Sequence, residues 1–406
     1  MKIIELLKSD DPRYKGHLWF FLGAYFFVLF NYPLVRAAAT TMFFEEFGAR
    51  SSPIAWLWTV LFLSVSIFIF NKYQTRHTVQ KVFLWASVLS MSLLGLSTLG
   101  FVLKIKYLTY VSFIWKEIYI VLQIHLLLAY ANNYFHKDEF KLIVGPVGAV
   151  GSIGGILGGL LTTYIGRGWG TTSVAWFSLS FVILPALLFL FTPVLISTEE
   201  KKKGPSPVAS LDSKDLKRYV FYIALVVMLS QFVINIADFK FNLSFEKSIG
   251  LSNDRTAYLG HVYTWTNLLT FILQFICLPL ILPRISEKAL HFFIPISYIG
   301  ATVGLMFISG NLLLPLAAFY IYLKAADYSL FSGGKELLYQ PLRPEQKYGA
   351  KYLTDMLVYR SSKALIAAVL IYLQTSFILN MMMIIFLLLW LIMVVKIFGI
   401  HRRLFN

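Results

Sequence analysis

The sequence predicts an all-α integral membrane protein whose helices cross the bilayer many times. Of its 406 residues, 58% are hydrophobic and only 14% are charged, whereas a soluble domain carries about 25% charged residues. Apolar runs of about 17 to 25 residues recur along the chain, and a helix of that length crosses a hydrocarbon core of about 30 Å. The net charge of +16 lies mostly in short loops between these runs. It therefore indicates membrane topology rather than nucleic-acid binding.

Six transmembrane helices are predicted in the first half of the chain. Their apolar runs cover residues 17–38, 53–71, 82–103, 108–131, 142–165 and 173–195. The fifth run carries glycines at three- and four-residue spacing, which form a smooth stripe along the helix. These are Gly145, Gly148, Gly151, Gly154, Gly155, Gly158 and Gly159. We expect a helix-packing face here, because the Gly-x-Gly-x-x-Gly order of a phosphate-binding loop is absent.

A polar linker precedes six further predicted helices. Residues 197–217 contain the stretch EEKKKGPSP, which has the composition of a linker. The apolar runs after it cover residues 218–237, 258–282, 291–309, 311–332, 360–376 and 378–398. The predicted organisation is an N-terminal six-helix half (1–196), a cytoplasmic linker (197–217) and a C-terminal six-helix half (218–406). With the N-terminus in the cytoplasm, most lysines and arginines fall on cytoplasmic segments, so both termini are predicted to be cytoplasmic.

Ionisable residues at membrane depth occur in four of the twelve predicted helices. An ionised side chain there costs about 2.5 to 3.5 kcal/mol, so such residues usually face a protein interior or a water-filled cavity. They lie in the first, fourth, seventh and tenth helices, which line the central cavity of a six-plus-six transporter of the major facilitator type. The predicted substrate-binding residues are Arg36, Lys116, Glu117, Asp238, Lys240, Lys324 and Asp327.

Some of these charges have a simpler explanation. Lys324 and Asp327 are three residues apart on one helix face and could form a self-contained pair. Lys116 and Glu117 are neighbours about 100° apart around a helix, so at least one of them needs a partner elsewhere. Arg36 has no acid within four residues and needs either a partner on another helix or an anionic ligand. Both interpretations stay open at this point.

Catalytic and metal-binding patterns are not found. The sequence contains no Ser-His-Asp order, no His-Glu-x-x-His and no Walker motif, and its single cysteine, Cys277, lies in an apolar run. His125 could relay protons, although a hydrogen-bonded interior histidine is the more common case. We therefore predict neither an enzyme nor a cofactor or metal site.

The segment from Lys335 to Lys363, KELLYQPLRPEQKYGAKYLTDMLVYRSSK, resembles the corresponding stretch of the ATP/ADP translocase-type nucleotide transporters. The matching positions are Lys335, Glu336, Tyr339, Pro341, Leu342, Lys347, Lys351, Asp355, Arg360 and Lys363. Residues 131–159 and 238–241 resemble the bacterial relatives of this family. The resemblance implies a nucleotide-like substrate and a bacterial inner membrane location. Exchangers of the family carry an acid, a lysine and an acid where this sequence has Ala37, Ala39 and Thr40.

The same segment is predicted to be cytoplasmic and to act as an inner gate. The proposed gate residues are Lys335, Glu336, Asp355, Arg360 and Lys363, with Glu336 or Asp355 pairing with a cation of the other half when the cytoplasmic side closes. Alternatively, the cations of this segment reflect the positive-inside bias and contact anionic lipid headgroups.

Together these features predict a monomeric secondary transporter, an antiporter by resemblance, that moves an anionic, phosphate-bearing solute by alternating access. An arginine fork and lysine charges suit a phosphate or carboxylate. One alternative is a transporter or flippase of a lipid or other amphipathic anion, because aromatic residues such as Trp115, Tyr119, Tyr263, Trp265 and Tyr328 could accommodate an acyl chain. Others are a non-transporting receptor or scaffold and a membrane-embedded enzyme. The expected partners are the small anion and membrane lipids.

Overall fold

The computed structural model describes residues 12–135, 137–189, 192, 213–308, 310 and 312–405. Within these ranges all regular secondary structure is helical, which confirms the predicted all-α class. The chain forms two compact units. Unit 1 comprises Met1–Gly48, Leu61–Glu199 and Ile249–Leu268, and unit 2 comprises Ala49–Val60, Glu200–Ser248 and Leu269–Asn406, each so far as described. Most of the predicted linker lies outside the described residues, so its role as the boundary between two halves stays a prediction.

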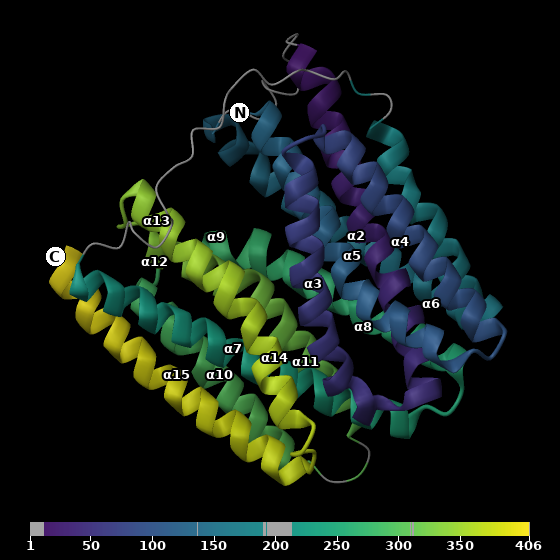
Figure 1. Cartoon of the computed structure of the whole chain (residues 1–406). Coiled ribbons are helices and arrows are strands. Elements are labelled where there is room, and N and C mark those ends of the chain that lie inside the picture. The colour runs from purple at the N-terminus through teal and green to yellow at the C-terminus, as the bar shows by residue number, and fades with distance from the viewer. Residues whose placement is uncertain are drawn as a thin grey trace. The chain divides into compact units, whose positions relative to one another are not determined.

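Unit 1 is built around the long helices α2 (Pro12–Phe47) and α6 (Lys137–Phe189), which pack against each other along their length (Figure 1). Helix α5 (Lys106–Tyr134) packs on α2, and α4 (Val79–Val102) packs on both α5 and α6. The unit also contains most of α3 (Ser52–Gln74) and the first part of α8 (Ser252–Ile272). Its apolar core lies between α2, α4, α5 and α6.

Unit 2 is organised around α7 (Lys214–Ser248). Helices α15 (Ser376–Phe405), α11 (Leu313–Ala326) and α14 (Tyr359–Leu370) pack on α7, and α10 (Glu287–Met306) packs on α15 (Figure 1). The shorter helices are η1 (Ala49–Ser51), α9 (Leu278–Ile281), α12 (Ser332–Tyr339) and α13 (Pro344–Lys351). Three π-helical turns, η2 (Leu273–Cys277), η3 (Asp327–Phe331) and η4 (Tyr352–Val358), interrupt the helices of this unit.

Each of the twelve predicted apolar runs overlaps helix in the described part of the chain, but the run 360–376 extends beyond α14, which ends at Leu370. Nine helices there are long and apolar enough to cross a membrane. The number is smaller than twelve because α6 contains two predicted runs, whereas η3 and η4 leave α11 and α14 short. Several helices extend beyond the apolar run that predicted them. Helix α7, for example, continues to Ser248 rather than ending near residue 237.

The predicted glycine stripe is confirmed as a packing face, and it packs on two sides. A Cβ added at Gly158 would lie 1.9 Å from the carbonyl oxygen of Phe30 on α2. A Cβ added at Gly159 would lie 2.3 Å from Thr264 Oγ1 on α8. On the α2 side, Phe26 and Phe30 stack at 5.8 Å between ring centroids, and Phe30 meets Phe181 edge-on at 4.9 Å. The glycines therefore let α6 approach α2 and α8 almost backbone to backbone.

Helix α6 changes direction at Gly170, where φ is +87°. This left-handed conformation disfavours any residue with a Cβ. The next residue, Thr171, donates its backbone N–H to Asn253 Oδ1 at 3.0 Å, and its hydroxyl lies 2.7 Å from that of Thr256. The bend separates the two predicted runs 142–165 and 173–195 and is held by the start of α8.

Candidate functional site

Lys116 is buried in unit 1 at membrane depth. Its side chain projects from α5 towards α2, is only 4% exposed, and donates from Nζ to Thr40 Oγ1 at 2.9 Å. The same ammonium lies 3.8 Å from the centroid of the Phe113 ring, which is a cation–π contact. A hydroxyl from α2 and an aromatic face of α5 therefore both contact this lysine.

Arg36 lies one helical turn before Thr40 on α2, so the two side chains share one face of the helix. Its guanidinium carbon lies 4.7 Å from the ring centroid of Tyr263 on α8 and 5.8 Å from that of Tyr32. Since Lys116 reaches the same face through Thr40, two cations converge within one turn of α2. Arg36 therefore contacts aromatic rings of two helices, α2 and α8.

Polar side chains next to these cations complete the unit 1 cluster. Glu117 follows Lys116 on α5 and is partly exposed. Asn31 lies on α2 and donates from Nδ2 to the hydroxyl of Tyr119 on α5 at 3.2 Å. Both Asn31 and Tyr119 are fully buried. This hydrogen bond fixes α2 against α5 about one turn away from Arg36.

In unit 2, Lys240 has a different setting from the one expected. It is 7% exposed, lies two turns before the end of α7, and donates from Nζ to Asn380 Oδ1 on α15. It also lines a cavity of about 430 Å³ formed by the ends of α7, α11 and α15. Asp238 on the same helix accepts a hydrogen bond from Asn242 Nδ2 at 3.3 Å.

Asp327 is the first residue of η3 and is 6% exposed. Its carboxyl group lies near the side chains of Gln231 on α7, Lys324 on α11 and Lys335 on α12. The ammonium of Lys324 also lies 5.6 Å from the ring centroid of Tyr328. Lys324 and Asp327 thus interact, as their spacing predicts, but Asp327 is also tied to α7 and to the start of α12. A π-helical turn is a frequent feature of functional sites.

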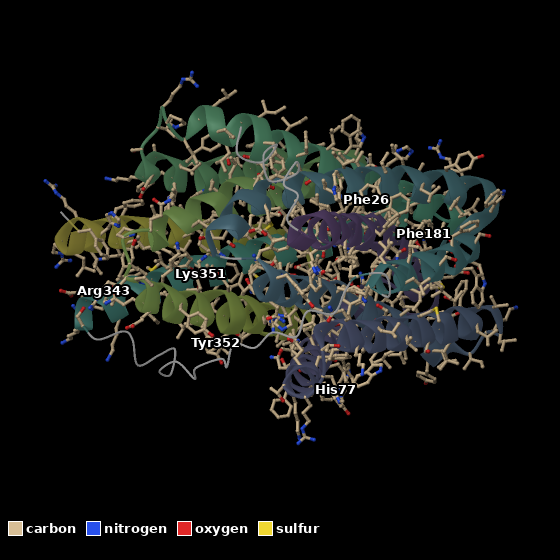
Figure 2. All side chains as sticks on the ribbon, turned by 90° about the horizontal axis from the view of Figure 1, so that it is seen from above. Phe26, His77, Phe181, Arg343, Lys351 and Tyr352 are labelled. Atoms are coloured by element: carbon tan, nitrogen blue, oxygen red, sulfur yellow. The ribbon has the colours of Figure 1, made fainter. Side chains whose placement is uncertain are left out.

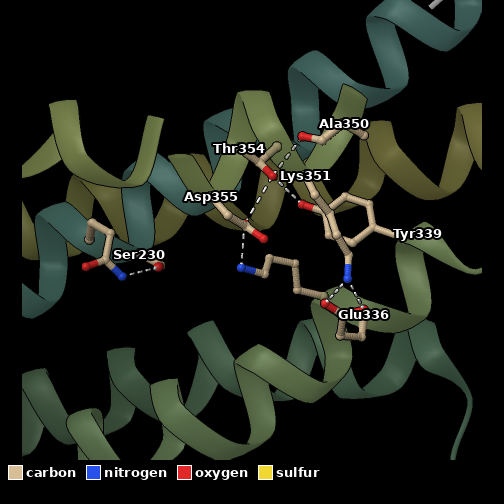
Figure 3. Close-up of polar contacts among 9 residues, drawn as sticks. Ser230, Glu336, Tyr339, Ala350, Lys351, Thr354 and Asp355 are labelled. Atoms are coloured by element: carbon tan, nitrogen blue, oxygen red, sulfur yellow. Dashed lines mark hydrogen bonds and ion pairs between the residues drawn. The ribbon is translucent and has the colours of Figure 1, made fainter. Parts of the chain in front are cut away.

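Two ion pairs join α12 to the segment that follows it (Figure 3). Lys335 Nζ lies 2.7 Å from Asp355 Oδ1, and Lys351 Nζ lies 2.7 Å from Glu336 Oε1. In this structure both acids of the predicted gate are therefore paired within one segment of unit 2. Their pairing with a cation of the other half stays a prediction.

A buried hydrogen bond lies between these ion pairs. The hydroxyls of Tyr339 and Thr354 are 2.6 Å apart, and the single O–H of Thr354 can donate to Ala350 O at 3.0 Å or to Asp355 Oδ1 at 3.1 Å (Figure 3). Burial, together with the charge of Asp355, raises the pKa of the Tyr339 phenol above its usual value. The phenol therefore stays neutral and able to donate over the physiological pH range.

The remaining gate residues lie on α14. Lys363 Nζ is 5.4 Å from the ring centroid of Trp56, which belongs to the part of α3 in unit 2. Arg360 is partly buried on the same helix. Arg343 and Lys351 bound α13 (Figure 2). The five predicted gate residues thus lie within the 333–363 segment, and three of them, Lys335, Glu336 and Asp355, form its two ion pairs together with Lys351.

Sequence reasoning missed four side chains that hold the predicted charges in place. These are Thr40, Gln231, Thr354 and Asn380. Each is a neutral polar residue, and buried polar groups need hydrogen-bond partners. A search for polar residues in or next to the apolar runs, rather than for charges alone, would have found Thr40, Gln231 and Asn380, whereas Thr354 lies in the segment predicted to be cytoplasmic.

A bundle of membrane-length helices that buries cations in both of its compact units has the architecture of a multi-pass membrane transporter. The sequence matches the Major Facilitator Superfamily over residues 21–334. The chain therefore belongs to the major facilitator superfamily.

Solved transporters show the same fold. A structure described as nucleoside transporter NupG superposes with a TM-score of 0.63 at 11% identity and covers 97% of this chain and 99% of its own. A bacterial homologue of the iron transporter ferroportin, in an inward-facing state, gives a TM-score of 0.65 at 12% identity, with 92% and 98% covered. A bacterial homologue of the lysosomal transporter Spinster gives 0.55 at 13% identity, with 97% and 96% covered. No curated protein sequence matches the chain.

Proposed function

We propose that this transporter moves an anionic, phosphate-bearing solute of the nucleotide type by alternating access, in exchange for a second anion. The observation that carries the proposal is the convergence of Arg36 and Lys116 on one turn of α2. Even with Glu117 counted, these three side chains keep a net positive charge at a depth where charge is costly. A bound phosphate or carboxylate would offset that cost through charge-assisted hydrogen bonds.

The aromatic rings around Arg36 support a substrate with a planar group. The rings of Tyr32 and Tyr263 lie within 6 Å of the guanidinium carbon. A nucleobase can stack on such rings while its phosphate contacts the cations. The resemblance of residues 335–363 to the ATP/ADP translocase-type carriers also favours a nucleotide.

Purified protein in proteoliposomes tests the proposal directly. Uptake of labelled ATP or ADP is measured with and without unlabelled nucleotide inside the vesicles, for the wild type, Arg36→Ala and Arg76→Ala. Arg76 is an exposed arginine near the end of α3 and is the matched control. We expect uptake that depends on internal nucleotide, is lost in Arg36→Ala and is unchanged in Arg76→Ala.

A binding experiment separates the substrate from the mechanism. A ligand present at 100 times its Kd stabilises the folded protein by about 2.7 kcal/mol, which raises its melting temperature measurably. ATP, ADP, inorganic phosphate, other anionic metabolites and lysophospholipids are compared. Stabilisation by lysophospholipid alone would instead favour a lipid transporter. Nucleotide uptake that survives Arg36→Ala would refute the role given to this arginine.

Location and assembly complete the proposal. We propose a bacterial inner membrane protein with both termini in the cytoplasm, acting as a monomer. The positive-inside distribution of lysine and arginine supports the orientation. Labelling of single cysteines introduced at each terminus, after Cys277 is replaced, would test it in intact cells.

A further inference from the structure

We propose that the cavity lined by Lys240 is a second anion site, which binds the phosphate group of a ligand within unit 2. The cavity has a volume of about 430 Å³ and lies between the ends of α7, α11 and α15. Pockets for small ligands usually have volumes of about 300 to 1,000 Å³. The cavity is therefore large enough for a phosphate with an organic substituent. This inference does not depend on the substrate proposed for Arg36 and Lys116.

The lining of this cavity is cationic and rich in hydroxyl groups. Lys240 lies inside it and Lys247 is exposed at its edge, and the described lining contains no acid. Hydroxyl and amide groups accompany the two lysines, from Ser244, Ser248, Ser376 and Gln374. Lysine ammonium groups and hydroxyls are the donors that phosphate oxygens accept from.

The setting of the Lys240 ammonium suits a phosphate ligand. Its ammonium is anchored on Asn380 Oδ1, a neutral acceptor that leaves the positive charge uncancelled. An ammonium has three N–H donors, so this one bond leaves others that can be directed into the cavity. A buried cation beside a neutral amide is a better anion site than a cation already paired with a carboxylate.

Part of the lining is apolar. Leu243, Leu312, Leu316 and Leu379 line the cavity together with the polar groups. A ligand with a phosphate and a less polar substituent could contact the polar groups with the phosphate and the leucines with the substituent. A soluble phosphate ester and a phospholipid headgroup share this chemistry.

This cavity lies far from the two ion pairs of the 333–363 segment. Tyr219, near the start of α7, donates its hydroxyl to Leu338 O, directly before Tyr339, whereas Ser244 of the cavity lies near the end of the same helix. At about 1.5 Å per residue, these positions on α7 are roughly 37 Å apart, which exceeds a hydrocarbon core of about 30 Å. The cavity and the ion pairs therefore belong to opposite membrane faces.

Pyridoxal 5′-phosphate is a suitable probe, because its aldehyde condenses with a lysine amine, releasing water, and borohydride reduces the resulting imine to a stable amine. The full-length protein in detergent is labelled with pyridoxal phosphate or with pyridoxal, which lacks the phosphate. Peptide mass spectrometry then quantifies each lysine. Exposed Lys217 on α7 is the internal control.

We expect pyridoxal phosphate to label Lys240 about tenfold more than pyridoxal does, because a phosphate held by the second lysine places the aldehyde at Lys240. Lys217 should show no such preference. Lys247→Ala leaves the labelled amine intact and removes an exposed charge, so the variant should fold. It should lower the preference at Lys240 about fivefold through the lost charge-assisted contact.

Protection experiments identify the source of the phosphate. Protection of Lys240 by inorganic pyrophosphate indicates a soluble ligand, and protection by phosphatidylglycerol vesicles alone indicates a lipid headgroup. Either result supports the site. The proposal is wrong if Lys240 reacts equally with both reagents, if it is labelled by neither while Lys217 is labelled, or if neither anion protects it. Nucleotide uptake through Arg36 could fail without affecting any of these outcomes.

Discussion

Gly158→Ala should separate helix α6 from α2. The added Cβ would lie 1.9 Å from the carbonyl oxygen of Phe30, about 1.5 Å short of an ordinary contact of 3.4 Å. The obstacle is backbone, so no side-chain rotation can relieve it. Overpacking of a core typically costs about 1 to 3 kcal/mol, and alanine returns about 1 kcal/mol of helix propensity relative to glycine. Because the clash is with backbone, the cost should lie at the upper end of this range, and we expect a net loss of about 2 kcal/mol of unfolding free energy.

Gly145→Ala is the matched control on the same helix. A Cβ at Gly145 meets no atom within 4 Å, so only the helix propensity changes and stability should be equal or slightly higher. Thermal unfolding followed by circular dichroism at 222 nm in detergent, with size-exclusion chromatography of each variant, measures the difference. Equal melting temperatures for the two variants would show that α2 and α6 are not in backbone contact, and would refute the two-sided packing of the glycine stripe.

Three further predictions concern the bend in α6 and the 333–363 segment. Gly170→Ala should lower the free energy of unfolding by about 1 to 2 kcal/mol, because φ is +87° there. Gly168→Ala should not lower it, because a Cβ at Gly168 meets open space. Thermal melts of the two variants, measured in parallel, check both expectations. Asp355→Asn removes the ion pair with Lys335 and should lower the free energy of unfolding by only about 1 kcal/mol, because the pair is partly exposed and solvent screens it. The charge-swapped double variant Lys335→Asp/Asp355→Lys should recover part of this loss. If it does not, the ion pair does not stabilise the protein. Tyr339→Phe removes the hydrogen bond with Thr354 and should lower the free energy of unfolding at neutral pH by about 1 kcal/mol. The pKa of this phenol is raised in the folded protein, so above pH 10 the phenol ionises in the unfolded chain first, and the wild type should lose stability there. The variant lacks the phenol and should lose less. Denaturation from pH 8 to 11 in which the stability of wild type and variant falls equally with pH would contradict this.

The sequence was sufficient to predict the helices and one of their packing surfaces. Hydropathy located every membrane run, because a bilayer demands about 20 apolar residues per helix wherever they fall in the chain. The spacing of Gly154 and Gly158 predicted a close helix contact for an equally local reason. Neither argument needed knowledge of the partner helix.

The partners themselves could not be predicted. Nothing near Gly159 indicates that it meets Thr264 on α8, about one hundred residues later. The setting of Lys240 was missed because hydropathy ended the seventh helix near residue 237, whereas α7 continues to Ser248 and places this lysine beside Asn380. The proximity of Asp327 to Gln231 on α7 joins residues almost one hundred positions apart, and no local pattern indicates it.

The two-sided glycine face on α6 has a consequence for biosynthesis. Its α2 side can be covered as soon as α6 has been made, but Gly155 and Gly159 meet Asn267 and Thr264 of α8. Ribosomes add about 5 to 20 residues per second, so the second side waits roughly 5 to 20 seconds for its partner. During that interval a groove of bare backbone faces lipid or the insertion machinery. Assembly of the N-terminal unit is therefore completed only by a helix from the second half of the chain, and a nascent chain arrested in the linker would remain unfinished.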